Sequence, residues 1–95
     1  MKALPDHVQP YRRTPTFDQD TVPAGLLRSH TTKAGVWARI CVLEGKLRYR
    51  ILTDPVHEHL LDPEHHGVVE PQVPHEIEPQ GDVSFYVEFL KPGPT

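Results

Sequence analysis

The chain has one cysteine and no long apolar run. Cys41 has no second cysteine with which to form an intramolecular disulfide, as is typical of proteins from a reducing compartment. No stretch of about 18 apolar residues is present that could span a membrane, and the N-terminal residues lack the apolar run of a signal peptide. These absences predict a cytoplasmic protein that has no membrane partner.

An excess of basic residues is also missing. The sequence has 10 Lys and Arg against 13 Asp and Glu, which gives a formal net charge of −3 and a pI near 6.1. A protein that binds nucleic acid normally carries a basic stripe that neutralises phosphates. The nearest approach is the pair Arg12 and Arg13, and two adjacent arginines are typical of a solvated face. We therefore expect no nucleic-acid partner.

Long helices are excluded because 11 prolines in 95 residues interrupt the stretches that would form them. Alternating apolar and polar residues over 36–43 and 47–51 predict two strands, and Glu44-Gly45 between them predicts a β-hairpin. Similar alternation over 83–90 predicts the last strand. Short strands separated by turns indicate an all-β sandwich or barrel.

At 95 residues the chain is long enough for a single domain. Residues 1–22 show no sustained period and are predicted to form an extended N-terminal arm, whereas residues 23–92 are predicted to form the barrel, beginning with a strand over 23–30. Residues 53–67 are polar and contain four histidines and two prolines. For this last stretch we expect a hairpin loop or a poorly paired edge.

Four stretches, taken in order, resemble a known family: PAGLLRSHTTKAGVW, VLEGKLRYRIL, VEPQVPHEIEP and FYVEFL. They are similar to the tellurite-resistance-related, TehB/YeaR-like family of small cupins, over about residues 10–92. The resemblance implies a cupin-like double-stranded β-helix barrel, a homodimer, and a pocket able to hold a divalent metal ion. It implies no named reaction.

The first metal-binding motif of cupins is reduced in this sequence. That motif has a His-x-His pair and a glutamate ahead of a glycine, whereas here Ala38 stands at the expected position of the glutamate and only His30 remains near the pair. The PxxPHxIE element supplies His75. The metal ligands predicted from the resemblance and the pattern are His30 and His75, with a carboxylate from Glu88 or Glu78.

Imidazole and carboxylate together suit zinc, iron, nickel or manganese. Glu78 follows His75 by three positions, so the two share a face only if the strand bends. Glu88 joins the site only if it faces the barrel interior. The alternative, in which Phe85, Val87 and Phe89 face inward and Glu88 is solvated, is equally open.

Other candidate residues receive weaker interpretations. The histidines of the polar stretch are expected to be solvated, although they could titrate near neutral pH and gate a barrel mouth: His57, His59, His65 and His66. Cys41 has apolar neighbours and is expected to be a small core residue rather than a nucleophile. Arg39, Arg48 or Arg50 could bind an oxyanion if one faced the pocket, but a solvated face is the commoner arrangement.

These expectations converge on a small metal-binding cupin-type protein that binds or transforms a small, anionic molecule in a stress or detoxification context. The alternative is a non-catalytic sensing or dimerisation module with a degenerate, empty pocket. The sequence leaves open whether the protein is an enzyme.

Overall fold

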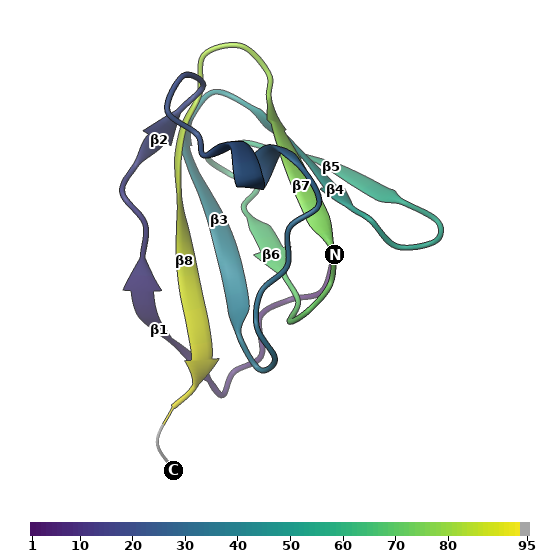
Figure 1. The fold of residues 1–95 in the computed structure, drawn as a ribbon. Helices are drawn as coiled ribbons and strands as arrows, with labels where there is room; N and C mark the ends of the chain where they lie inside the picture. Colours follow the sequence, from purple (N-terminus) through teal and green to yellow (C-terminus); the bar gives the residue numbers. More distant parts are fainter. Residues whose placement is uncertain (94–95) are drawn as a thin grey trace.

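The computed structural model describes residues 1–93, which form two antiparallel β-sheets (Figure 1). The first sheet contains, in spatial order, β1 (Val8–Arg13), β8 (Ser84–Pro92), β3 (Trp37–Glu44) and β6 (Gly67–Val69), and β2 (Phe17–Asp18) also pairs with β8. The second sheet contains β5 (His57–Leu61), β4 (Leu47–Ile51) and β7 (His75–Pro79). The prediction of a small all-β domain is confirmed.

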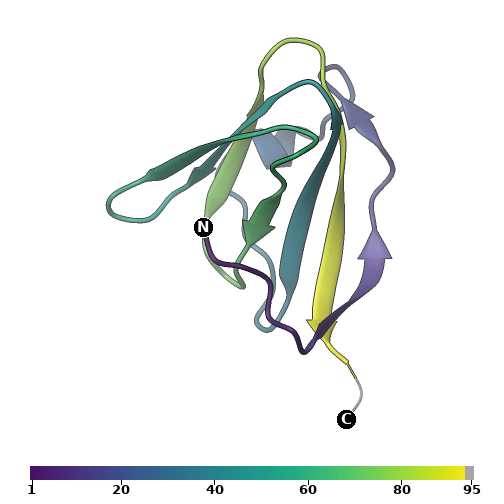
Figure 2. The same ribbon diagram turned by 180° about the vertical axis from the view of Figure 1, so that it is seen from behind.

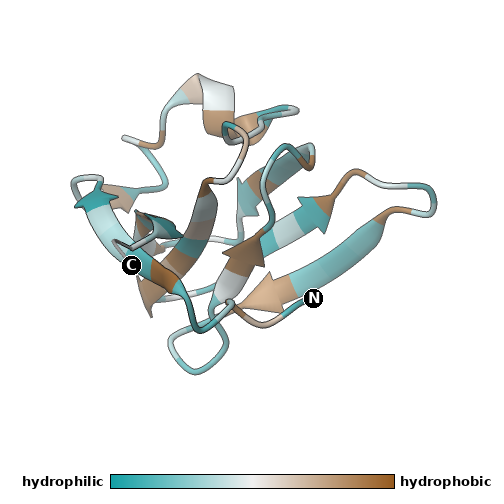
Figure 3. Cartoon of the chain, turned by 90° about the horizontal axis from the view of Figure 1, so that it is seen from below, coloured by the Kyte–Doolittle hydropathy of each residue, from teal (hydrophilic) through white to brown (hydrophobic). Residues whose placement is uncertain are grey.

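Helical structure within residues 1–93 is limited to one short 3₁₀ helix, η1 (Ala24–Leu27). No helix in this part of the chain has the length and apolar character needed to cross a membrane. Seen from below, η1 lies to one side of both sheets and carries hydrophobic residues (Figure 3). The strand predicted over 23–30 is therefore wrong, because Leu26 donates a backbone hydrogen bond of 3.0 Å to the Pro23 carbonyl and so forms a tight helical turn.

The apolar faces of the two sheets pack against each other and form the core. Val42 of β3 lies opposite Phe85 of β8, and Tyr49 of β4 lies opposite Ile77 of β7. All four side chains are buried, and each apolar side chain of this size stabilises the fold by about 1.5–3 kcal/mol when it leaves water. The buried hydroxyl of Tyr49 donates a hydrogen bond of 3.0 Å to the Val68 carbonyl. Alternation in the sequence separated the two faces of β3 and β4 correctly, whereas it left open which face of β8 points inward.

The predicted hairpin between residues 36–43 and 47–51 is wrong, although both strands exist. β3 pairs with β8 and β6, whereas β4 pairs with β5 and β7, so the two strands belong to different sheets. The chain crosses between the sheets at Gly45, whose φ is 79°. A Cβ at Gly45 would lie 2.1 Å from the Asp82 carbonyl oxygen, so only glycine fits. The two sheets share no strand and do not close into a barrel, and the cupin-like double-stranded β-helix is not confirmed.

Residues 53–67 contain a regular strand where a loop or a poorly paired edge was expected. β5 pairs with β4 over five residue pairs, from Leu47 opposite Leu61 to Ile51 opposite His57. Ion pairs across the exposed face support this pairing, such as Arg48 Nε to Glu58 Oε1 at 2.7 Å. The hairpin of β4 and β5 extends away from the rest of the molecule (Figures 1 and 2).

The predicted arm, residues 1–22, contributes two strands. β1 and β2 both pair with β8, and a register shift between Pro10 and Arg12 interrupts β1. The Thr14 N–H continues this attachment by donating a hydrogen bond of 2.9 Å to the Val87 carbonyl. The division of the chain at residue 22 stays a prediction.

Candidate functional site

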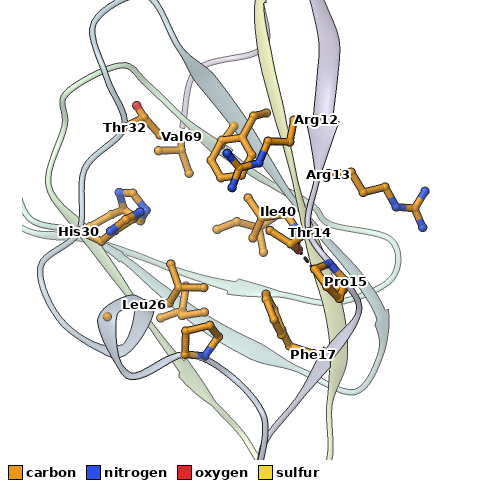
Figure 4. Close-up of a pocket in the computed structure, with 17 residues that line it drawn as sticks. Arg12, Arg13, Thr14, Pro15, Phe17, Leu26, His30, Thr32, Ile40 and Val69 are labelled. Atoms are coloured by element: carbon orange, nitrogen blue, oxygen red, sulfur yellow. Dashed lines mark hydrogen bonds between the residues drawn. The ribbon is translucent and has the colours of Figure 1, made fainter.

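A cavity of about 520 Å³ lies between the two sheets and the segment that precedes β3 (Figure 4). β3 and β8 contribute Ile40 and Val87 to its lining, β7 contributes Ile77, and residues before β3 contribute Phe17 and Leu26. Most of the lining side chains are apolar, and none is a carboxylate. Size and lining are those of a site for a small organic molecule.

His30 and His75 lie side by side in the wall of this cavity. Their backbones form an antiparallel bridge, in which the N–H of His30 donates to the His75 carbonyl at 2.8 Å and the reverse hydrogen bond measures 2.9 Å. Their rings meet edge to face, with centroids 5.5 Å apart. The structure thus brings together two residues that are 45 positions apart in the sequence.

A hydrogen bond to the backbone selects one tautomer of the His75 imidazole. Its side chain is buried, and its Nδ1 lies 3.1 Å from the Val73 carbonyl oxygen. A carbonyl oxygen only accepts, so Nδ1 carries the hydrogen and Nε2 of the neutral ring is an acceptor. Burial lowers the pKa of His75 below its ordinary value of 6.5 and outweighs the hydrogen bond with Val73, which raises it, while the neighbouring His30 also lowers it. His75 is therefore neutral at pH 7.

Two arginines at the end of β1 differ in orientation. Arg12 extends toward the cavity, whereas Arg13 points away from it (Figure 4). The Arg12 guanidinium carbon lies 5.4 Å from the centre of the Phe89 ring, which also lines the cavity. The Arg13 guanidinium carbon lies 3.9 Å from the centre of the Tyr86 ring, so Arg13 has a cation–π partner elsewhere. Arg12 thus brings a positive charge to the apolar cavity.

Neither predicted carboxylate ligand faces the histidines. Glu88 forms an ion pair with Arg39, its cross-strand neighbour, on the face of the sheet opposite to Ile40 and Val87. This answers the question left open by the sequence, because the apolar residues of β8 face inward. Glu78 lies on the outer face of the second sheet, where its Oε1 is 3.2 Å from Arg48 Nη1. His30 and His75 therefore stand in the cavity without either acid.

The remaining candidates also lie outside the cavity. Arg39, Arg48 and Arg50 form ion pairs with glutamates on the outer faces, and none lines the cavity, so the oxyanion alternative does not apply to them. In the polar stretch, His65 Nδ1 lies 2.8 Å from Asp62 Oδ1, and this hydrogen bond lowers the pKa of Asp62. Within residues 1–93, no group of three or more His, Cys, Asp or Glu side chains is placed to hold a metal ion.

Among the first 32 positions, sequence reasoning identified His30 but missed the other residues that line the cavity. Arg12 and Phe17 were assigned to an arm, and Leu26 to a strand. Thr32 lines the cavity too, with its hydroxyl already donating a hydrogen bond of 2.7 Å to the Val36 carbonyl. The sequence feature that marks this region is the pair Arg12 and Arg13, followed by isolated apolar residues. Such a pattern does not by itself indicate a binding site.

Comparison with known proteins gives a match to the TehB-like domain over residues 12–87, which is most of the chain. The chain belongs to the TehB-like family. It is 38% identical over 53 residues to the probable S-adenosyl-L-methionine-dependent methyltransferase TehB of Haemophilus influenzae (strain KW20 / Rd), a match that covers 53% of this chain and 18% of that protein. The same identity is found with TehB of Haemophilus influenzae (strain 10810).

Two crystal structures resemble the TehB-like chain closely. TehB from Haemophilus influenzae superposes with a TM-score of 0.84 and 32% identity, over 92% of this chain and 32% of that one. A protein from E. coli (strain K12) superposes with a TM-score of 0.87 and 26% identity, over 99% of this chain and 100% of that one. The TehB-like chain therefore spans at most a third of TehB and the whole length of the E. coli protein.

The comparisons correct three expectations. The resemblance to the TehB-like, tellurite-resistance-related family is confirmed, but the description as a cupin is not supported. The metal-binding function is wrong, because the named relatives are probable S-adenosyl-L-methionine-dependent methyltransferases. The divalent metal cofactor, whether zinc, iron, nickel or manganese, is wrong for the same reason, and residues 1–93 contain no cluster of ligands for one.

Proposed function

We propose that this TehB-like chain is a small-molecule-binding domain that serves an S-adenosyl-L-methionine-dependent methyltransferase, and that its cavity holds the methyl acceptor. The observation that carries the proposal is the apolar cavity of about 520 Å³ between the sheets. Its family membership supports the link to methyl transfer, since TehB contains a similar domain within a longer chain. The E. coli structure supports an independent domain, because it consists of this fold alone.

S-adenosyl-L-methionine itself does not suit this cavity. The molecule carries a sulfonium and an ammonium group, and the lining offers no carboxylate to either. Arg12, whose guanidinium extends toward the cavity, has the same sign as these two groups and could pair only with the carboxylate of the molecule. Nucleoside sites also commonly use an acidic side chain to bind ribose hydroxyls, and the cavity has none. The methyl donor is therefore assigned to the methyltransferase and the acceptor to this domain.

The domain's own residues would bind and orient the acceptor. The inner faces of β3, β7 and β8 exclude water, and the neutral Nε2 of His75 accepts a hydrogen bond from a polar group of the ligand. His30 would hold the His75 ring through their edge-to-face contact. A cytoplasmic location and a homodimer stay predictions.

The test uses Haemophilus influenzae TehB from which the segment similar to this chain has been removed. Release of S-adenosylhomocysteine is measured with a panel of aromatic thiols and carboxylates as trial acceptors, with and without the TehB-like chain added. We expect the chain to lower the KM for the acceptor and to leave the KM for S-adenosyl-L-methionine unchanged. Ala38→Phe, which would fill the cavity from β3, should abolish the effect. The proposal fails if the chain has no effect, or if the chain alone binds S-adenosyl-L-methionine and Ala38→Phe blocks that binding.

A further inference from the structure

We infer that the cavity binds an amphipathic anion, with an apolar body between the sheets, a hydrogen-bond donor directed at His75 and an anionic group at Arg12. This inference rests on the proposed function, because it specifies the chemical class of ligand for the same cavity. Three features carry it: the apolar walls, a free acceptor on one side, and on the other a guanidinium that has no carboxylate partner.

The apolar body follows from the facing walls of the cavity. Ile40 and Val87 come from neighbouring positions on β3 and β8, and Leu26 of η1 lies across from them (Figure 4). Such walls gain nothing from a fully hydrated ion, whereas an apolar group that displaces water from them is bound by the hydrophobic effect. A small inorganic oxyanion would fill only a fraction of the 520 Å³ and leave these walls exposed.

The expectation that the ligand carries a hydrogen-bond donor follows from His75. Thr32, which also lines the cavity, already has hydrogen-bond partners in the protein. Nδ1 of His75 is occupied by the Val73 carbonyl, which leaves Nε2 as the free acceptor. The Thr32 hydroxyl is already used, because it donates to the Val36 carbonyl at 2.7 Å and accepts from the Gln72 N–H at 3.4 Å. A ligand N–H or O–H that enters the cavity can take the place of water as the donor to Nε2.

The expectation that the ligand carries an anionic group follows from a comparison of the partners that each arginine has in the protein. Arg39 and Arg48 have glutamate partners, and Arg13 stacks on Tyr86. Arg12 has no Asp or Glu carboxylate within 4.0 Å among residues 1–93, and its guanidinium extends toward the cavity lining (Figure 4). The planar guanidinium presents paired N–H groups that match the oxygens of a carboxylate, sulfonate or phosphate. Arg12 and His75 thus lie on different sides of one apolar space. Together they select a ligand that has an anionic group at one end and a hydrogen-bond donor at the other.

Three fluorescent probes separate these features. The first, 2-anilinonaphthalene-6-sulfonate, has a sulfonate at one end, an N–H donor at the other and an apolar body. The second, N-phenyl-2-naphthylamine, lacks the sulfonate, and the third, 2-(N-methylanilino)naphthalene-6-sulfonate, lacks the donor. Fluorescence titration of the full chain should give the lowest Kd for the first probe, lower than that for either of the others by about threefold to tenfold, the size expected of one partly exposed polar interaction.

Substitutions assign each difference to a residue. Arg12→Gln should remove the advantage of the sulfonate and leave the Kd of the neutral probe unchanged. Arg13→Gln is the matched control and should leave all three Kd values unchanged, because Arg13 points away from the cavity (Figure 4). His75→Leu should remove the advantage of the N–H donor, provided that circular dichroism shows the native fold. Ala38→Phe should weaken all three probes together.

The outcomes distinguish this inference from the proposed function. If the neutral probe binds as tightly as the sulfonate and Arg12→Gln has no effect, the cavity binds ligands but not anions, and only the inference is overturned. An equal Kd for the two sulfonates would likewise remove the role given to His75. If no probe binds, or if Ala38→Phe changes nothing, the cavity is not a ligand site, and the proposed function fails with the inference.

Discussion

His30 and His75 are joined both by two backbone hydrogen bonds, of 2.8 and 2.9 Å, and by the edge-to-face contact of their rings. The bridge fastens the segment after η1 to β7, at the start of a strand in the second sheet. Since the rest of the N-terminal segment is attached to β8 of the first sheet, this segment spans the two sheets and forms one wall of the cavity.

Acidification is expected to destabilise the fold through His75. Burial lowers the pKa of His75 below 6.5, so the folded protein binds fewer protons than the unfolded chain as the pH falls. The stabilisation is complete above the ordinary pKa of about 6.5 and is lost as the pH falls through the lower pKa of the folded state. Urea unfolding at several pH values should show this loss in the wild type and not in His75→Leu. Equal pH dependence in both would contradict it, and the exposed His66→Gln should behave as the wild type.

Gly45→Ala should be the most damaging of the simple glycine substitutions. A Cβ there would lie 2.1 Å from the Asp82 carbonyl oxygen, and the φ of 79° is strained for alanine. We expect a loss of about 3 kcal/mol in the free energy of unfolding, measured by urea denaturation. Gly35→Ala is the control: its φ is 76° but the space around it is open, so it should cost about 1 kcal/mol. If the two variants lost equal free energy of unfolding, the backbone of Asp82 would be able to move away from a Cβ at Gly45, and the prediction would be contradicted.

The ion pair of Arg39 and Glu88 should contribute to stability. The Glu88 side chain is 13% exposed, so Glu88→Gln leaves the arginine with a poorer, partly desolvated partner. A double-mutant cycle with Arg39→Gln should give a coupling of about 1 kcal/mol. The same cycle for Arg48 and Glu78, in which the glutamate side chain is 51% exposed, should give less than about 0.5 kcal/mol. A negligible coupling for the first pair would contradict the prediction.

Phe85→Ala should remove a large part of the stability. Phe85 is fully buried between the sheets, and its ring lies 5.8 Å from that of Phe17. Truncation of such a ring costs about 3–5 kcal/mol. Phe89→Ala provides the comparison, because Phe89 is only partly buried and should cost about 1–2 kcal/mol. Thermal or urea unfolding of the two variants gives the difference, and equal costs would place Phe89 in the core as firmly as Phe85.

Much of the core could be predicted from the sequence, whereas the pairing of strands could not. A period of two assigns side chains to two faces of a strand, and the apolar faces that it marks on β3 and β4 are the inward ones. The same period does not say which strands are neighbours. Residues 36–43 and 47–51 look like a hairpin, but the chain passes into a second sheet at Gly45, where the Asp82 backbone approaches closely. That contact joins positions far apart in the sequence, and no local pattern reveals it.

The site could be predicted from the sequence only in part, for two physical reasons. The alternation of β8 was compatible with either facing of Glu88, and the outcome was decided by Arg39 on the neighbouring strand. Arg12 was missed because β1 shifts register between Pro10 and Arg12, which interrupts the period that would have marked it as a strand. The expectation of a metal came from the cupin resemblance rather than from a full set of ligands in the chain.

The walls of the cavity come from both ends of the chain, with Phe17 before the first long strand of the core and Phe89 near the end of the last. Such a cavity exists only in the native state, so any molecule that fills it draws the folding equilibrium toward that state. A ligand at 100 times its Kd raises the free energy of unfolding by about 2.7 kcal/mol. For a domain of this size, that gain raises the melting temperature by about 10 °C or more. The folding equilibrium can therefore serve as the assay by which the natural ligand is found.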